Sequence, residues 1–219
     1  MRLVFVSCFL VLTSLLAPAR AEHAQRAEAP PDEFDLDAIG AVRAGLGWSE
    51  LYDARILSLS FEDHIRVARL SDDVGGLVTF GMDGQRPLGV SRSKRGFLAT
   101  TLGGGFLFHN EPGPAVVLSM TLAPLLSSGE DGATKLVGFG LGTRAEVYPF
   151  YETLAKVVRC ERGPFRTYVL SGLHAWLLTR RDWLGQSGES YAFGLGFDLG
   201  RNVVLPVLGA ALPAACASR

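Results

Sequence analysis

Beyond its first residues, the sequence has no long uninterrupted run of apolar residues. Each later apolar stretch is broken by Gly, Pro or a charged residue, well short of the roughly 20 residues that a transmembrane helix requires. In lipid, closed barrels are the alternative to helices for satisfying backbone hydrogen bonds. If this chain crosses a membrane, it must therefore cross as β-strands.

The start of the chain has the three parts of a secretory signal peptide. Met1 and Arg2 give a short positive start, residues 3–16 are mainly apolar, and Ala19-Arg20-Ala21 forms a small-residue cleavage site before Glu22. The sequence therefore predicts that residues 1–21 are removed and that the rest functions outside the cytoplasm.

The sequence also lacks an excess of charge of either sign. It contains 21 basic and 22 acidic residues, and removal of the signal peptide, with its two arginines, leaves the balance close to neutral. Proteins that bind nucleic acid usually present a strongly basic surface. The composition therefore gives no electrostatic case for a nucleic-acid partner.

Cysteine is scarce, with three residues in the whole chain. Cys8 lies inside the apolar run and not after it, so the sequence does not predict a lipoprotein. Cys160 and Cys216 remain after processing, and an oxidising compartment would allow them to form a disulfide. Two unpaired thiols are the alternative, and the sequence favours neither.

The exported part divides into three regions by composition. Residues 22–33 are Ala, Pro and charged residues without periodicity, which predicts a flexible N-terminal segment. Residues 34–210 are predicted to form one β-barrel domain, and residues 211–219 a C-terminal tail.

The dominant signal in the predicted domain is the alternation of large apolar residues with small or polar ones. This period of two is typical of a β-strand with two unlike faces. The clearest windows are residues 98–108, 115–125, 137–148 and 191–200.

Weaker windows raise the expected number of strands to about eight, with ten as the upper count. These windows are residues 34–47, 52–61, 64–70, 76–82 and 166–179, and residues 203–207 are a candidate last strand. Polar connections such as residues 110–113 and 127–133 indicate antiparallel hairpins. A short helix is predicted at residues 152–159. The predicted fold is an all-β, antiparallel up-and-down barrel.

The second face of the four clear windows is mostly Gly, Ala, Ser and Thr. On the outer face of a soluble barrel we would expect many Lys, Glu, Thr and Gln residues. Here the charged residues are only Arg144, Glu146 and Asp198, which suits a narrow lumen in which charges satisfy one another. We therefore predict a polar cluster of these three residues inside the barrel.

The signal peptide, the alternating glycine and aromatic strands, the short turns and the polar loops together resemble the small bacterial outer-membrane β-barrel superfamily. The resemblance covers roughly residues 34–210 and rests on pattern, without a diagnostic motif. It implies contact with outer-membrane lipids, insertion by the barrel assembly machinery, and a lumen too narrow for a general pore. Members usually end on a strand that finishes with an aromatic residue, which this chain does not.

No catalytic, cofactor or metal-binding set is recognisable in the sequence. None of the four histidines has a serine two residues away, as the lipid deacylases of this superfamily would require, and Ser171 and His174 are separated by three. His64 beside Glu62 and Asp63, and His109 beside Glu111, do not form a recognisable ligand set.

The sequence thus predicts an outer-membrane β-barrel with a structural or surface-interaction role. Two alternatives remain: a soluble periplasmic β-barrel that binds a small apolar ligand, and a lipid-modifying barrel hydrolase. The first would be released from cells without detergent, and the second would need Ser, His and acidic side chains to converge in space.

Overall fold

The computed structural model describes residues 37–89, 96–110, 113–128, 134–153, 170–183 and 187–204. They form eight β-strands and one short π-helix, in the order β1 (Ala38–Ser49), β2 (Ala54–Ser71), β3 (Val74–Pro87), β4 (Phe97–His109), β5 (Gly113–Ser128), β6 (Thr134–Tyr151), β7 (His174–Trp183), β8 (Ser187–Asp198) and η4 (Gly200–Val204). The predicted signal peptide, N-terminal segment and C-terminal tail, together with Cys160 and Cys216, lie outside the described residues.

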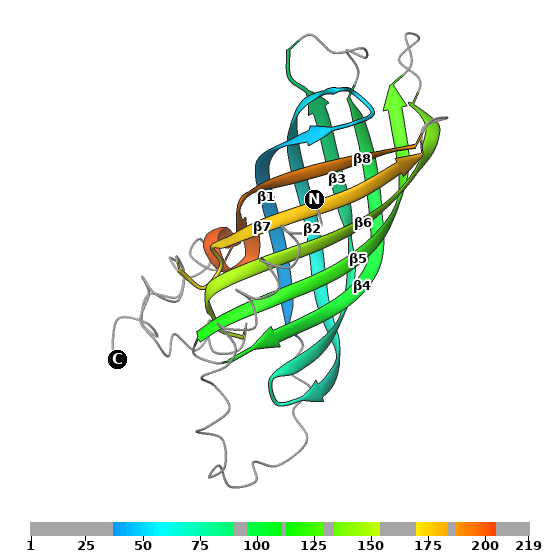
Figure 1. The fold of residues 1–219 in the computed structure, drawn as a ribbon. Coiled ribbons are helices and arrows are strands. Elements are labelled where there is room, and N and C mark those ends of the chain that lie inside the picture. The colour runs from blue at the N-terminus through cyan, green and yellow to red at the C-terminus, as the bar shows by residue number, and fades with distance from the viewer. Residues whose placement is uncertain are drawn as a thin grey trace, which may run out of the picture. The chain divides into compact units, whose positions relative to one another are not determined.

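The strands close into a barrel in sequence order (Figure 1). Each strand pairs antiparallel with the next, and β1 pairs antiparallel with β8, from Ala41 opposite Asp198 to Ser49 opposite Ser190. The prediction of an eight-stranded, up-and-down barrel is confirmed.

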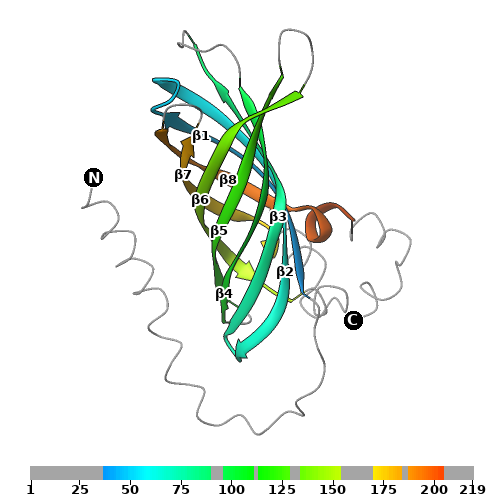
Figure 2. The same ribbon diagram turned by 90° about the vertical axis from the view of Figure 1, so that its right-hand side faces the viewer.

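The two ends of the barrel differ in their connections. We call the end with the β1–β2 turn, residues 50–53, the upper rim, and the end with the β2–β3 turn, residues 72–73, the lower rim (Figures 1 and 2). The strand order places the first residue of β1, the last residue of β8 and the longest connection, residues 152–173, at the lower rim. Within the described residues, no helix is long and apolar enough to cross a membrane.

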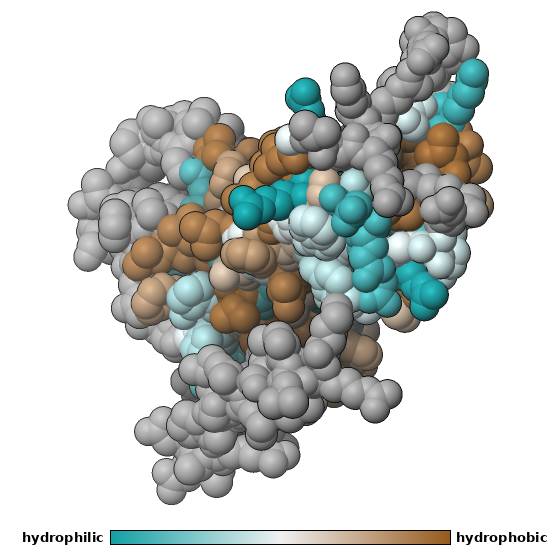
Figure 3. Space-filling view, turned by 45° about the horizontal axis from the view of Figure 1, so that its top comes forward, coloured by the Kyte–Doolittle hydropathy of each residue, from teal (hydrophilic) through white to brown (hydrophobic). Residues whose placement is uncertain are grey.

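Large apolar side chains point outward, as the alternation predicted. In β8, the outward residues Phe193 and Leu195 are 65% and 74% exposed, whereas Ala192, on the inward face of the same strand, is buried. The same holds for the outward residues of the other clear windows, Leu98, Leu102, Phe106, Leu118, Met120, Leu122, Val137, Phe139 and Leu141. A space-filling view shows apolar residues gathered on part of the surface (Figure 3).

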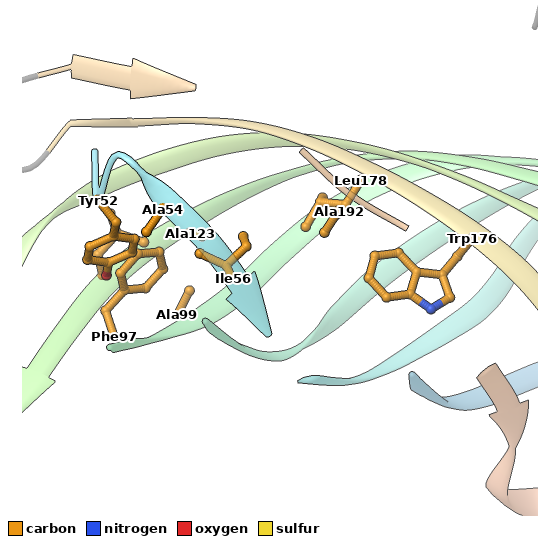
Figure 4. Close-up of a cluster of buried hydrophobic side chains, with 10 residues drawn as sticks. Tyr52, Ala54, Ile56, Phe97, Ala99, Ala123, Trp176, Leu178 and Ala192 are labelled. Atoms are coloured by element: carbon orange, nitrogen blue, oxygen red, sulfur yellow. The ribbon is translucent and has the colours of Figure 1, made fainter. Parts of the chain in front are cut away.

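The inward faces form two apolar clusters and several polar networks. One cluster includes Tyr52, Ile56, Phe97 and Leu125, and reaches Trp176 along the lumen (Figure 4). The other includes Ile39, Leu107, Tyr148 and Tyr151. The charged networks lie among these clusters, so the lumen is filled by side chains.

Two predicted strands that were thought to be separate are one. The window 52–61, from Ala54 onward, and the window 64–70 belong to the single strand β2, in which Glu62 and His64 point into the lumen and Asp63, between them, points outward. The strand alternation therefore continues through a charged stretch that looked like an interruption.

Two other boundaries were wrong. The window 166–179 is shifted, since β7 begins at His174 and Leu170–Gly172 lie outside it. A last strand at 203–207 does not form in its described part: Val203 and Val204 belong to η4, where the backbone N–H of Arg201 donates to Asp198 Oδ1 at 2.8 Å and turns the chain. In the predicted helix 152–159, Glu152 and Thr153 are not helical, and residues 154–159 lie outside the described residues.

Candidate functional site

The middle of the lumen holds a network of charged side chains that are almost fully buried. We call it the central network, and it consists of Arg43 from β1, Glu62 and His64 from β2, and Arg144 and Glu146 from β6. Charged side chains are rarely buried to this extent unless they are paired. The contacts that these side chains make with one another therefore account for their burial.

The period of two along β2 is what delivers its acidic and histidine side chains to the lumen. One face of β2 carries the inward row Ser58, Ser60, Glu62, His64 and Arg66, while the alternate positions Leu57, Leu59 and Phe61 point outward. Successive side chains of a strand point to opposite faces, so this polar row must share one side. Closure of the barrel makes that side the lumen.

Arg43 is the centre of the network. Its Nη2 atom donates to Glu146 Oε1 at 2.6 Å and lies 2.7 Å from His64 Nε2, while its Nη1 atom is 3.4 Å from Glu62 Oε2. One guanidinium thus joins β1 to β2 and to β6 across the lumen. A planar guanidinium with five donors suits this bridging role better than an ammonium group would.

Arg144 completes the charge balance. Its Nη1 atom donates to Glu62 Oε2, the same oxygen that faces Arg43. Two arginines therefore meet two glutamates in this network. Because isolated buried charges are very unfavourable and paired ones much less so, each partner makes the burial of the others tolerable.

Glu146 has partners on its second oxygen as well. Tyr148 donates its hydroxyl to Glu146 Oε2 at 2.8 Å, and His174 Nε2 lies 3.7 Å from the same oxygen. The rings of Tyr148 and His174 stack with their centroids 4.5 Å apart. The space for these rings comes partly from Gly196, where a Cβ atom would lie 2.3 Å from His174 Nε2.

A second network, toward the upper rim, is built around Arg180 of β7. Its guanidinium donates to Asp83 of β3, and its Nε atom lies 2.7 Å from Asp182 Oδ1. Ser58 and Ser190 donate hydroxyls to these two carboxylates at 3.3 and 3.4 Å. This upper network ties β2, β3, β7 and β8 together inside the barrel.

The upper rim itself is closed by aromatic packing. Tyr52, in the β1–β2 turn, stacks on Phe97 with a ring-centroid distance of 6.1 Å, and the Arg180 guanidinium lies 4.6 Å from the Phe97 ring. Tyr52 is only 4% exposed. Burial raises the pKa of the Tyr52 hydroxyl above its ordinary value, and the nearby Asp182 raises it further.

A third network closes the lower rim around Arg201 of η4. Its guanidinium contacts Asp37 Oδ1 at 2.7 Å and Asp198 Oδ2 at 2.5 Å, and donates to the carbonyl oxygen of Ala38 at 2.9 Å. Burial lowers the pKa of Arg201, but the charges of Asp37 and Asp198 outweigh it and raise the pKa above its ordinary value. Arg201 therefore stays charged and holds the two ends of the barrel chain together.

The three residues predicted to cluster in the lumen are all buried, but the structure pairs them differently. Arg144 and Glu146 both belong to the central network, where Arg144 contacts Glu62 and Glu146 contacts Arg43. Asp198 lies instead with Arg201 at the lower rim. Cys160 and Cys216, for which the sequence leaves a disulfide or two unpaired thiols open, lie outside the described residues.

The sequence analysis did not place the remaining charged residues of these networks in the lumen, and it considered Glu62 and His64 only as a local cluster. Arg43, Glu62, His64, Asp83, Arg180, Asp182 and Arg201 come from strands with weak alternation or from η4. The polar row on β2 was the available signal, because its members recur at every second position between outward leucines. The partners on β6 could not be inferred locally, since Glu146 is 103 positions away from Arg43.

Three ligand-type side chains in the central network approach one another as they would around a metal ion. One ligand atom each from Glu62, His64 and Glu146 lies within 4.8 Å of the others. The guanidinium nitrogens of Arg43 and Arg144 already contact these carboxylates, however. A cation placed there would be repelled by both arginines, so the donor set does not fit a metal.

Thr79 of β3 lies beside the central network and places a hydroxyl in series with a histidine and a carboxylate. Thr79 Oγ1 lies 2.8 Å from His64 Nδ1, and His64 Nε2 lies 3.0 Å from Glu146 Oε1. Such a series can activate a nucleophile. All three residues are fully buried, however, so a substrate has no contact with the hydroxyl. The geometry does not support the hydrolase alternative at this position.

No family model matches the chain, and no curated protein matches it either. Among solved structures, it is similar to Neisserial surface protein A, with 11% identity, a TM-score of 0.44, and coverage of 75% of this chain and 97% of that one. It is also similar to Ail, the attachment invasion locus protein of Yersinia pestis, in complex with the heparin analogue sucrose octasulfate, with 9% identity, a TM-score of 0.41, and coverage of 75% and 99%.

A de novo designed barrel, TMB2.3, is a further match, with 14% identity, a TM-score of 0.32, and coverage of 76% of this chain and 98% of that one. These matches agree with the predicted resemblance to small barrels, but with TM-scores below 0.5 and identities of 14% or less they add no argument to the closed barrel that the strand pairing itself shows.

Proposed function

We propose that this chain is an integral outer-membrane β-barrel with a filled lumen and a structural or surface-interaction role. The observation that carries the proposal is the reversal of polarity across the barrel wall. Outward positions are large and apolar, such as Leu46 at 55% and Leu102 at 65% exposure, whereas inward positions hold buried ion pairs. A wall of this kind is stable when lipid surrounds the barrel.

The same observation counts against the soluble alternative. A soluble barrel that binds an apolar ligand would turn its apolar faces inward and place charged residues outside. In this barrel, the charged side chains of Arg43, Glu62 and Glu146 are inside and fully buried. Contiguous apolar surface of this extent on a soluble protein would promote aggregation.

The position of the chain ends suggests an orientation. Both ends of the barrel chain, at β1 and β8, reach the lower rim. An exported chain enters the membrane from the periplasm, and its polar N-terminal segment, residues 22–33, is costly to carry across lipid. We therefore assign the lower rim to the periplasmic side and the upper rim to the cell surface, with insertion by the barrel assembly machinery and outer-membrane lipids as the proposed partners.

The membrane location predicts heat-dependent migration in detergent gels. The full chain, expressed with its own N-terminal segment in a Gram-negative host, is expected to fractionate with outer membranes. Unboiled samples should migrate differently from boiled ones, because a closed barrel resists detergent until it is heated. The measurement is gel mobility of the outer-membrane fraction with and without boiling.

A soluble periplasmic control protein, processed in parallel, should be released by osmotic shock without detergent. Recovery of the barrel chain in that released fraction, with the same mobility before and after boiling, would reject the membrane proposal.

The filled lumen predicts that the barrel does not conduct ions. The central and upper networks and the Tyr52–Phe97 stack occupy the lumen at successive levels. Purified protein in planar lipid bilayers is therefore expected to give no sustained single-channel current, whereas a general porin added to the same bilayer should. Steady openings of the purified barrel would contradict the assignment of the networks as a structural plug.

A further inference from the structure

Two arginines lie side by side on the outer surface of the barrel near the upper rim. Arg55 is in β2 and Arg86 is in β3, and both are exposed. Leu57 is directly opposite Arg86, so Arg55, two residues earlier on the same face, is a diagonal neighbour of Arg86. Diagonal neighbours on one sheet face are close enough for long side chains to meet a common ligand.

Among the described residues, neither arginine forms an ion pair with an acidic side chain. Of the other exposed arginines in this part of the structure, Arg69 contacts Asp72 at 2.6 Å, and Arg181 lies directly opposite Glu189 in the strand register. Arg55 is opposite Trp48, and Arg86 is opposite Leu57. Two guanidinium groups of like charge are thus placed together without a carboxylate between them, which is unfavourable unless an external anion binds there.

The surface directly below these arginines is apolar. Leu46, Leu59 and Met82 are 55%, 52% and 47% exposed on β1, β2 and β3. Phe61 and Phe80 continue the same outer face further from the rim. A ligand that reaches both the arginines and this wall must therefore carry an anionic head and an apolar body.

We propose that the outer surface of β2 and β3 at the upper rim binds a phosphorylated lipid of the surrounding leaflet. The phosphate contacts Arg55 and Arg86, and the acyl chains lie along the wall formed by Leu59, Met82 and Phe80. Guanidinium groups bind phosphate through two parallel hydrogen bonds. Trp48 is exposed and lies opposite Arg55. Tryptophan side chains favour the boundary between headgroups and acyl chains, which is where this proposal places Trp48.

The charge of the neighbouring sequence is consistent with this choice. The stretch between β3 and β4 includes Arg92, Lys94 and Arg95 and contains no acidic residue from Leu88 to Gly96. Its net positive charge would attract an anionic leaflet over the range of the Debye length. The proposed contacts themselves involve Arg55 and Arg86 and do not depend on this stretch.

This inference rests on the proposed membrane location, so the test begins with folded protein. The full chain is purified in a neutral detergent, its heat-dependent gel migration is confirmed, and a fluorescent diphosphoryl lipid A is titrated into it. Binding is compared with that of the Arg55→Gln, Arg86→Gln and doubly substituted proteins. We expect each single substitution to weaken binding about fivefold and the double substitution roughly twentyfold, with the difference shrinking as salt is added.

Arg69→Gln is the matched control, because Arg69 is an exposed arginine on the same strand as Arg55 but near the lower rim and paired with Asp72. It should bind lipid A like the unsubstituted chain. Dephosphorylated lipid A should bind weakly and equally to all variants, and inorganic pyrophosphate should compete only at far higher concentration than the lipid.

Equal binding of lipid A by the unsubstituted and doubly substituted proteins, both with heat-dependent migration, would overturn the lipid site and leave the barrel proposal intact. Competition by pyrophosphate as strong as that by the lipid would also overturn it, because the apolar wall would then contribute nothing. Absence of heat-dependent migration in the unsubstituted chain would reject the membrane barrel, and this inference with it.

Discussion

Reversing the charge of Arg144, by an Arg144→Glu substitution, is expected to lower the free energy of unfolding by about 4 kcal/mol or more. The substitution removes the cation that contacts Glu62 and adds a third carboxylate to a buried site that then has only Arg43 to balance it. Urea unfolding of protein inserted in lipid vesicles, followed by tryptophan fluorescence, measures the change. A smaller folded fraction in unboiled gels should accompany it.

Arg69→Glu is the control for charge reversal at a position where water screens the charge. The Arg69 side chain is 64% exposed and its partner Asp72 is 87% exposed, so we expect a change below about 1 kcal/mol. A double substitution, Arg144→Met with Glu62→Gln, should be more stable than Arg144→Glu, because it leaves no unbalanced charge. Equal stabilities of Arg144→Glu and the unsubstituted barrel would contradict the placement of Arg144 in the lumen.

The success of the sequence prediction at β8 and its failure at β2 have one physical explanation. In β8, Phe193 and Leu195 alternate with Ala192 and Gly194, and the strand can be identified from its own residues. In β2, Glu62 and His64 do not pair with residues of their own strand, so the stretch looked like a break between two strands. Their partners are Arg43 and residues of β6, which only closure of the barrel brings into contact.

The same explanation accounts for the end of β7, which is Trp183 and not residue 179 as predicted. The stretch Thr179–Trp183 contains three charged residues, which on a soluble sheet would indicate a loop. Arg180 and Asp182 instead point into the lumen, where Arg180 meets Asp83 of β3. The glycines of the inward faces were a useful signal, since Gly140 leaves room for Arg180 and Gly196 for His174. Which large side chain fills each space depends on strands that are distant in sequence.

The lower rim gives the second large prediction. Substitution of Arg201 by Met is expected to lower the free energy of unfolding by about 3 kcal/mol or more, because it removes the cation that the buried carboxylates of Asp37 and Asp198 both contact. The loss of structure should begin at the lower rim, since Arg201 also donates to the carbonyl oxygen of Ala38 at the start of β1. Amide hydrogen exchange should therefore accelerate along the β1–β8 seam near Ala41 before it accelerates elsewhere.

Two comparisons separate a specific closure of the seam from a general loss of packing. Arg201→Lys keeps the charge but not the fork of donors, so it should recover part of the stability lost in Arg201→Met. Asp198→Asn combined with Arg201→Met should also recover part of it, because one unpaired carboxylate is removed. If exchange instead accelerates equally at the upper rim, near the Tyr52–Phe97 stack, the three networks unfold as one unit, and Arg201 has no separate role in joining β1 to β8.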